Sequence, residues 1–138
     1  MRIDSSRKAY LCFQKSMAKE VEEFWIAGLG PQLDLIECKL LFRGTADRCL
    51  IHPRDIIKTV CLQNATSFIV AHNHPSGHLN PSVQDVQITK QILQLSRLLE
   101  IPLNDHLIVG QSHYFSFADS GYLARYANFR SMKKSFCR

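Results

Sequence analysis

Two histidines separated by a single residue, His72 and His74, and a later aspartate, Asp85, are the side chains of this chain best suited to chemistry. Imidazole and carboxylate groups bind zinc at about 2.0–2.2 Å, and a catalytic zinc keeps its fourth position for water. Taken singly, such residues are more often strand-end histidines and surface acids. Three potential ligands within one short stretch instead predict a metal site.

The segment that precedes the histidines predicts how they are positioned. The apolar run Ser67–Ala71 is typical of a buried strand, and it leads directly into His72-Asn73-His74. Successive side chains of a strand point to opposite faces. We therefore expect His72 and His74 to lie on the same face, where both reach one metal ion.

The segment that follows predicts a loop and then a helix. Pro75 and Gly77 mark the loop, and Asn80-Pro81 is typical of a helix cap followed by the first helical residue. Asp85 falls in the opening turns. It shares a stripe of helical periodicity with Ile88, Ile92, Leu95 and Leu99. An acid on a core-facing stripe is costly unless it is paired or bound to a metal.

The remaining elements predict one domain of the α/β class. Helices are expected over residues 8–21 and 53–64, and from residue 80 to about residue 100, with a short helical end. Strands are expected over 22–29 and 33–42, near Ile51, over 67–74, 106–109 and 114–117. This order indicates a mixed β-sheet flanked by helices on its faces.

The spacing of His72, His74, Ser82 and Asp85 resembles the JAMM signature of the MPN+ (JAB) metallopeptidases. Further segments resemble the RadC family of bacterial proteins: His72–Gly77, Leu41–Thr45, His52–Asp55, Asp105–Gly110 and Phe115–Ala118. The resemblance implies an MPN (JAB)-like fold. It places a catalytic domain at residues 1–124 and leaves a basic C-terminal tail at residues 125–138.

For the chemistry, the resemblance implies a zinc-dependent peptidase or isopeptidase whose Zn²⁺ is held by His72, His74 and Asp85. Its substrate would be a peptide or protein. The family's general base is a glutamate at the start of an early strand, and Glu23 matches that position. Glu22, which would face the other side of the strand, and Glu37 remain alternatives.

Ser82 has two candidate roles. Its hydroxyl suits a helix cap. The resemblance also implies that this hydroxyl stabilises the oxyanion of the tetrahedral intermediate beside the metal. The remaining histidines fall outside the metal pattern, and we expect no catalytic role for them: His52, His78, His106 and His113.

The composition indicates whether the protein is associated with a membrane and in which compartment it is found. The 138 residues include no apolar run long enough for a membrane helix and no signal peptide, so no membrane association is expected. An odd count of 5 cysteines without a signal suggests reduced thiols in the cytoplasm. The oligomeric state is left open.

The net charge of +5 is concentrated at the C-terminus. The basic residues there are Arg125, Arg130, Lys133, Lys134 and Arg138. Such a tail allows nucleic acid to bind, but a solvated terminus is the favoured interpretation. The alternative function is a DNA-associated protein of the RadC type, in DNA repair or as a metal-dependent nuclease. A single zinc-type site, without the second metal common in nucleases, disfavours it. A third alternative is a binding module with a structural metal.

Overall fold

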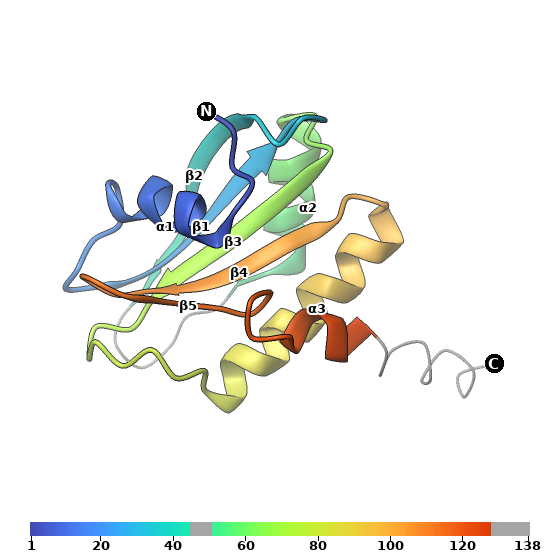
Figure 1. Cartoon of the computed structure of the whole chain (residues 1–138). Helices are drawn as coiled ribbons and strands as arrows, with labels where there is room; N and C mark the ends of the chain where they lie inside the picture. Colours follow the sequence, from blue (N-terminus) through green and yellow to red (C-terminus); the bar gives the residue numbers. More distant parts are fainter. Residues whose placement is uncertain (45–50, 128–138) are drawn as a thin grey trace, which may run out of the picture.

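A five-stranded mixed sheet forms the centre of the computed structural model, which describes residues 1–44 and 51–127 (Figure 1). The strand order is β2-β1-β3-β4-β5. The strands are β1 (Glu22–Leu29), β2 (Leu35–Gly44), β3 (Ser67–Asn73), β4 (Leu103–Val109) and β5 (Tyr114–Ser116). Only the β3–β4 pair is parallel among these neighbours; the others are antiparallel.

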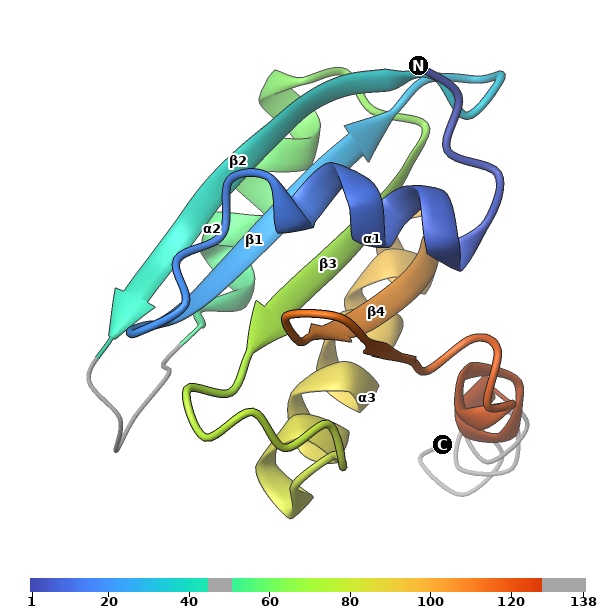
Figure 2. The same ribbon diagram turned by 60° about the vertical axis from the view of Figure 1, so that its left-hand side comes forward.

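Helices cover both faces of this sheet, as Figures 1 and 2 show. Helix α1 (Ser6–Gln14) lies on one face, and α2 (Pro53–Leu62) and α3 (Val83–Leu99) lie on the other. The alternation of β3 explains the two layers, because every residue of this central strand is buried. Phe68 and Val70 join the core under α2 and α3, whereas Ile69 and Ala71 join the core under α1. The predicted α/β class, with a mixed sheet between helices, is confirmed.

The register of β1 against β3 decides which side chains share a face. Phe24 pairs with His72, and Ile26 pairs with Val70. Paired residues of neighbouring strands point to the same side, so Phe24 and His72 both face the α2–α3 layer. Glu23, one residue before Phe24, points to the opposite side, and its backbone N–H donates to the side-chain oxygen of Asn73 at 2.7 Å.

Some predicted boundaries were wrong. The first helix ends at Gln14 rather than at residue 21. The long helix begins later than expected, at Val83 rather than at Pro81. Its N-cap residue is Ser82 rather than Asn80. The reason is a capping box, in which Ser82 and Asp85 each bond the other's backbone N–H. Ser82 therefore has the capping role that the sequence suggested.

Two predictions fall wholly or partly on residues outside the described ranges. Most of the short strand expected to end near Ile51 belongs to residues 45–50, and Ile51 itself is not in a strand. Of the basic tail, only residues 125–127 are described, at the end of a helical segment that begins at residue 122. Within the described ranges, no helix has both the length and the apolar character needed to cross a bilayer.

Candidate metal centre

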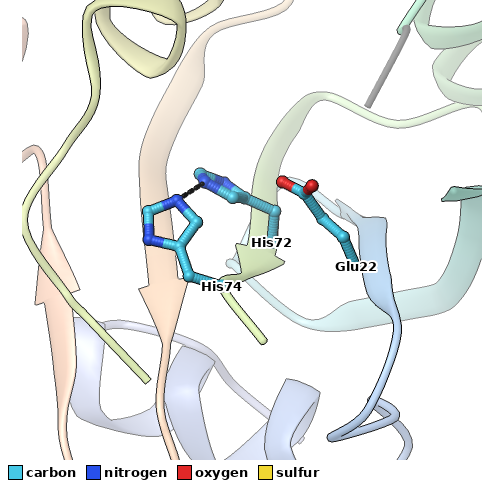
Figure 3. A group of neighbouring side chains, drawn as sticks. All are labelled: Glu22, His72 and His74. Carbon is cyan, nitrogen blue, oxygen red and sulfur yellow. Dashed lines mark hydrogen bonds between the residues drawn. The ribbon is translucent and has the colours of Figure 1, made fainter. Parts of the chain in front are cut away.

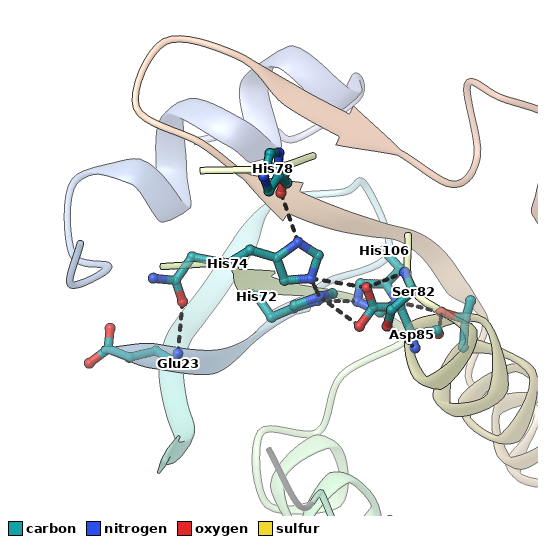
Figure 4. A network of polar contacts seen from close by, with 9 residues as sticks. Glu23, His72, His74, His78, Ser82, Asp85 and His106 are labelled. Carbon is teal, nitrogen blue, oxygen red and sulfur yellow. Dashed lines mark hydrogen bonds and ion pairs between the residues drawn. The ribbon is translucent and has the colours of Figure 1, made fainter. Parts of the chain in front are cut away.

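The three predicted ligands meet at the carboxyl end of β3, beside the first turn of α3 (Figure 4). His72 Nε2 lies 3.1 Å from Asp85 Oδ1, and His74 Nε2 lies 3.0 Å from Asp85 Oδ2. The two Nε2 atoms are 3.1 Å apart. Strand alternation brings the histidines to one face, and the capping box turns Asp85 towards them.

A chain of hydrogen bonds sets the tautomer of His72. The Thr89 hydroxyl donates to the Asp85 carbonyl at 2.6 Å, so its oxygen is left to accept from His106 Nδ1, also at 2.6 Å. Burial holds the pKa of His106 well below its ordinary value, so the ring is neutral and its Nε2 is an acceptor. His72 Nδ1 donates to that atom at 2.8 Å. The lone pair of His72 Nε2 consequently faces Asp85.

His74 is oriented by a different partner with the same result. Its Nδ1 lies 2.7 Å from the backbone carbonyl of His78, which can only accept, so Nδ1 carries the proton. The Nε2 lone pair of a neutral His74 therefore also points at Asp85. Bonding the second ring nitrogen in this way is how proteins orient metal-binding histidines.

This donor set fits a zinc ion. Two imidazole nitrogens and a carboxylate are zinc ligands, and bonds of about 2.0–2.1 Å in tetrahedral geometry separate neighbouring ligand atoms by about 3.3 Å. The separations of 3.0–3.1 Å are close to that value. Two ring nitrogens and a carboxylate this close repel one another through their lone pairs unless a cation or a proton lies between them.

The closeness of these groups shifts the pKa values of His74 and Asp85. The hydrogen bond that a protonated His74 donates to the Asp85 carboxylate raises the pKa of His74, against the opposing effect of burial. Burial alone would raise the pKa of Asp85, but the close contacts of its carboxylate with the His72 and His74 rings hold that pKa well below its usual range. The same contacts that would hold a cation therefore favour protonation of His74.

Glu22 joins the two histidines from the neighbouring strand (Figure 3). One ligand atom from each of Glu22, His72 and His74 lies within 4.8 Å of the others. Half-burial raises the pKa of Glu22 above its ordinary value, against the attraction of both histidines. A carboxylate of this kind beside a metal site is suited to accept a proton.

Glu23, the predicted base, lies on the opposite face, and this part of the prediction is corrected. Its carboxylate points away from the histidines (Figure 4) and accepts hydrogen bonds from the Ala18 N–H at 2.7 Å and Trp25 Nε1 at 2.9 Å. Arg43 Nη2 pairs with it at 2.6 Å. Burial would raise the pKa of Glu23, but these bonds outweigh burial and lower it. The prediction erred by one residue, which in a strand reverses the face.

The other alternative to Glu23, Glu37, lies far from the candidate ligands. It pairs with Gly28 on the edge strand β2, towards the end of β1 away from His72, and its side chain is exposed. Among the three candidate glutamates, only Glu22 reaches the metal centre.

Ser82 lies at the edge of the site and bonds its ligand twice. Its N–H donates to Asp85 Oδ2 at 2.9 Å, and its hydroxyl oxygen accepts the Asp85 N–H at 3.0 Å. The hydroxyl proton takes no part in this cap and remains available to a bound molecule. Ser82 is exposed, so such a molecule can reach it.

A cavity of about 570 Å³ opens beside these groups. Its lining combines the candidate metal ligands with apolar and amide side chains from β1, the β3–α3 loop and α3. The residues are Glu22, Phe24, Ile51, His72, His74, Pro75, Ser76, Asn80, Ser82, Gln84, Asp85, Ile88 and Gln91.

His106 was expected to have no catalytic role and Thr89 was not singled out from the sequence, yet both orient a predicted ligand. Both side chains are fully buried. One signal was present: Thr89 is a polar residue on the core-facing stripe of α3, one turn after Asp85. The position of His106 beside His72 comes from the parallel pairing of β3 and β4, in which Val70 pairs with His106 and His72 with Ile108.

Comparison with known proteins identifies the family of this chain. The family model described as the RadC-like JAB domain matches residues 3–122. A UPF0758 protein of Thermotoga maritima is 42% identical over 122 residues, which cover 88% of this chain and 55% of the relative.

Two further relatives show the same level of similarity. The UPF0758 protein YeeS of Escherichia coli is 45% identical over 104 residues, covering 75% of this chain and 70% of its own. A UPF0758 protein of Histophilus somni is 45% identical over 105 residues, which cover 76% of this chain and 47% of the relative. The chain thus spans about half the length of several curated relatives that it matches.

Proposed function

Because this chain belongs to the family of RadC-like JAB domains, we propose that it is a zinc-dependent hydrolase that cleaves peptide or isopeptide bonds. The observation that carries the proposal is the convergence of His72 Nε2, His74 Nε2 and the Asp85 carboxylate, with Glu22 on the same face. A structural metal would be enclosed by protein ligands, whereas this one would face a cavity.

The chain's own groups supply what such a hydrolase needs around its metal. A zinc ion bound there would lower the pKa of a water ligand to about 7 and polarise a carbonyl oxygen. Glu22 accepts the proton of the attacking water and passes it to the leaving nitrogen, a contribution of about 10²–10⁴ in rate. Its raised pKa brings it closer to the pH at which both transfers occur.

Ser82 is proposed to stabilise the carbonyl oxygen of the bond that is cleaved. Its unused hydroxyl proton is directed towards the oxygen on which negative charge develops, and one such donor is worth about 3 kcal/mol in other enzymes. The same residue holds Asp85 through its backbone N–H. Ser82 therefore links the position of a ligand to the position of the donor.

The first test is metal content by elemental analysis of protein purified without a metal-chelating tag. We expect about one zinc per chain in the wild type and in Glu22→Gln, and none in His74→Ala or Asp85→Ala. Peptide and isopeptide libraries are then screened with the zinc-loaded wild type, with Glu22→Gln as the inactive control that retains its metal. A wild type that neither contains zinc nor takes it up would overturn the proposal.

A further inference from the structure

We propose that the cavity beside the metal centre binds an extended, uncharged peptide segment, with an apolar side chain packed between Phe24 and Ile88 and its backbone held by Gln84 and Gln91. This inference rests on the proposed hydrolase function and adds to it the chemistry of the substrate. It follows from three features of the cavity: its charge, its apolar wall and the spacing of its amides.

The charge of the cavity disfavours anionic substrates. Its charged lining residues are Glu22 and Asp85, and no lysine or arginine from the described ranges reaches it. Phosphate groups are bound by arginine, lysine or helix N-termini. Here the N-terminus of α3 is already capped by Ser82 and Asp85. A zinc ion at the proposed centre would offset these two carboxylates, so a phosphodiester or an acidic side chain beyond the metal would find no cation among the described lining residues.

The wall beside the ligands is apolar. Phe24 lies next to His72 with its ring parallel to the imidazole, at an interplanar angle of 6° and a centroid distance of 6.0 Å. Ile51 and Ile88 are half-buried and line the same cavity. An apolar substrate side chain placed here would lose its contact with water, which is favourable in proportion to the area covered.

The amide side chains follow the cavity along α3. Gln84, Ile88 and Gln91 are spaced by four and three residues, so they lie on one face of the helix. Seven residues of helix span about 10 Å, the length of about three residues of extended peptide. Both glutamines are exposed, and their side chains make no hydrogen bond to any described residue. Each side-chain amide offers both a donor and an acceptor, as a peptide backbone requires.

The test uses binding rather than turnover. The probes are peptide hydroxamates, whose hydroxamate group chelates zinc, in two series that extend the peptide to either side of that group. Within each series the neighbouring residue is Leu, Ala or Glu, and acetohydroxamate is the probe without a peptide. Affinities for the zinc-loaded full chain are measured by calorimetry. We expect one series to favour Leu over Ala by about tenfold or more and over Glu by a larger factor.

Variants on α3 assign this selectivity to named residues. Ile88→Lys should reverse the preference towards Glu, whereas the matched control Leu98→Lys should not, because Leu98 is 81% exposed and lies outside the cavity. Gln84→Ala and Gln91→Ala should weaken every peptide probe by about three- to tenfold, without changing the Leu-to-Glu ratio or the affinity of acetohydroxamate.

The outcomes separate the two proposals. Equal affinities for Leu and Glu probes in both series would overturn the substrate inference, as would an Ile88→Lys variant that behaves like Leu98→Lys. The metal centre would remain supported in either case, because the probes still bind. If acetohydroxamate does not bind to zinc-treated wild type, the metal centre itself fails and both proposals fall.

Discussion

Glu22 and Glu23 are consecutive residues of β1, yet their carboxylates lie on opposite faces of the sheet. Glu22 faces His72 and His74 in the cavity. Glu23 is buried on the other side, where Arg43 pairs with it. The two acids therefore give a matched pair of variants, in which the same chemical change is made at adjacent positions with different surroundings.

We predict that Glu22→Gln and Glu23→Gln affect different properties. Glu22→Gln removes the proton acceptor and should lower kcat/KM by about 10²–10⁴ while the zinc content is unchanged. Glu23→Gln weakens hydrogen bonds to a charged group and should lower the free energy of unfolding by about 1–3 kcal/mol. Steady-state kinetics and urea unfolding measure the two effects. The opposite pattern, with turnover lost only in Glu23→Gln, would restore Glu23 as the base.

Thr89→Val should weaken zinc binding although it leaves all three candidate zinc ligands unchanged. Valine keeps the shape of threonine but leaves His106 Nδ1 without its acceptor, so the tautomer chain to His72 is no longer enforced. Loss of such an orienting partner costs about 10–100-fold in metal affinity. Competition with a chromophoric chelator measures it. Ser96→Ala is the control, since it removes another buried hydroxyl of α3 that bonds only the Leu93 carbonyl; an equal loss in both variants would contradict the tautomer argument.

Ser82→Ala should reduce both stability and turnover. Loss of the cap is expected to lower the free energy of unfolding by about 1 kcal/mol, and loss of the hydroxyl donor to lower kcat by about 10²–10³. Ser5→Ala is a matched control, because Ser5 caps α1 by accepting the Lys8 N–H at 3.2 Å and lies outside the cavity. It should show the loss of stability alone. Unchanged turnover in Ser82→Ala would remove the oxyanion role and leave only the cap.

Zinc affinity should fall as the pH falls. Asp85 raises the pKa of His74, so it favours a proton on the atom that zinc must occupy. The protonated His74–Asp85 pair stabilises the metal-free fold at low pH, and this stabilisation is lost as the pH rises through the raised pKa. Below that pKa, the competing proton should weaken zinc binding about tenfold per pH unit. Chelator competition from pH 5.5 to 8 checks this; an affinity that does not vary with pH would contradict it.

Asp105 should make stability decrease between about pH 4 and pH 6. Burial raises the pKa of this carboxyl from 3.8 to about 6, despite hydrogen bonds from Ser116, Ala118 and His106. The folded state therefore holds the proton more tightly than the unfolded state, so stability is highest below the unfolded pKa and is lost as the pH rises through the folded one. The difference corresponds to about 3 kcal/mol.

Other carboxyl groups titrate in the same range, so the Asp105 effect is isolated by difference. Urea unfolding of the wild type and of Asp105→Asn is compared at each pH. We expect the wild type's free energy of unfolding, relative to the variant's, to decline from pH 4 to pH 6.5. A relative stability that rises over this range would show that the hydrogen bonds outweigh burial.

Local sequence was sufficient to predict that the three candidate ligands, His72, His74 and Asp85, lie close together, and which elements carry them. Alternation along β3 places His72 and His74 on one face whatever the rest of the chain does. The proximity of Asp85 to its own cap follows equally from short-range geometry, because a capping box joins residues three positions apart. The family resemblance rested on the same residues, and the match over residues 3–122 confirms it.

Pairing between distant segments was decided only by the tertiary structure. The antiparallel register that sets Phe24 opposite His72 selects Glu22 over Glu23, and a single-residue shift would exchange them. The parallel pairing of β4 with β3 brings His106 against His72 across a separation of 34 positions. Hydrophobic periodicity specifies which residues of a strand are buried, but not which strand lies beside it or in which register. For this reason the candidate ligands were predictable from the sequence, whereas the proposed proton acceptor and the residues that orient His72 required the fold.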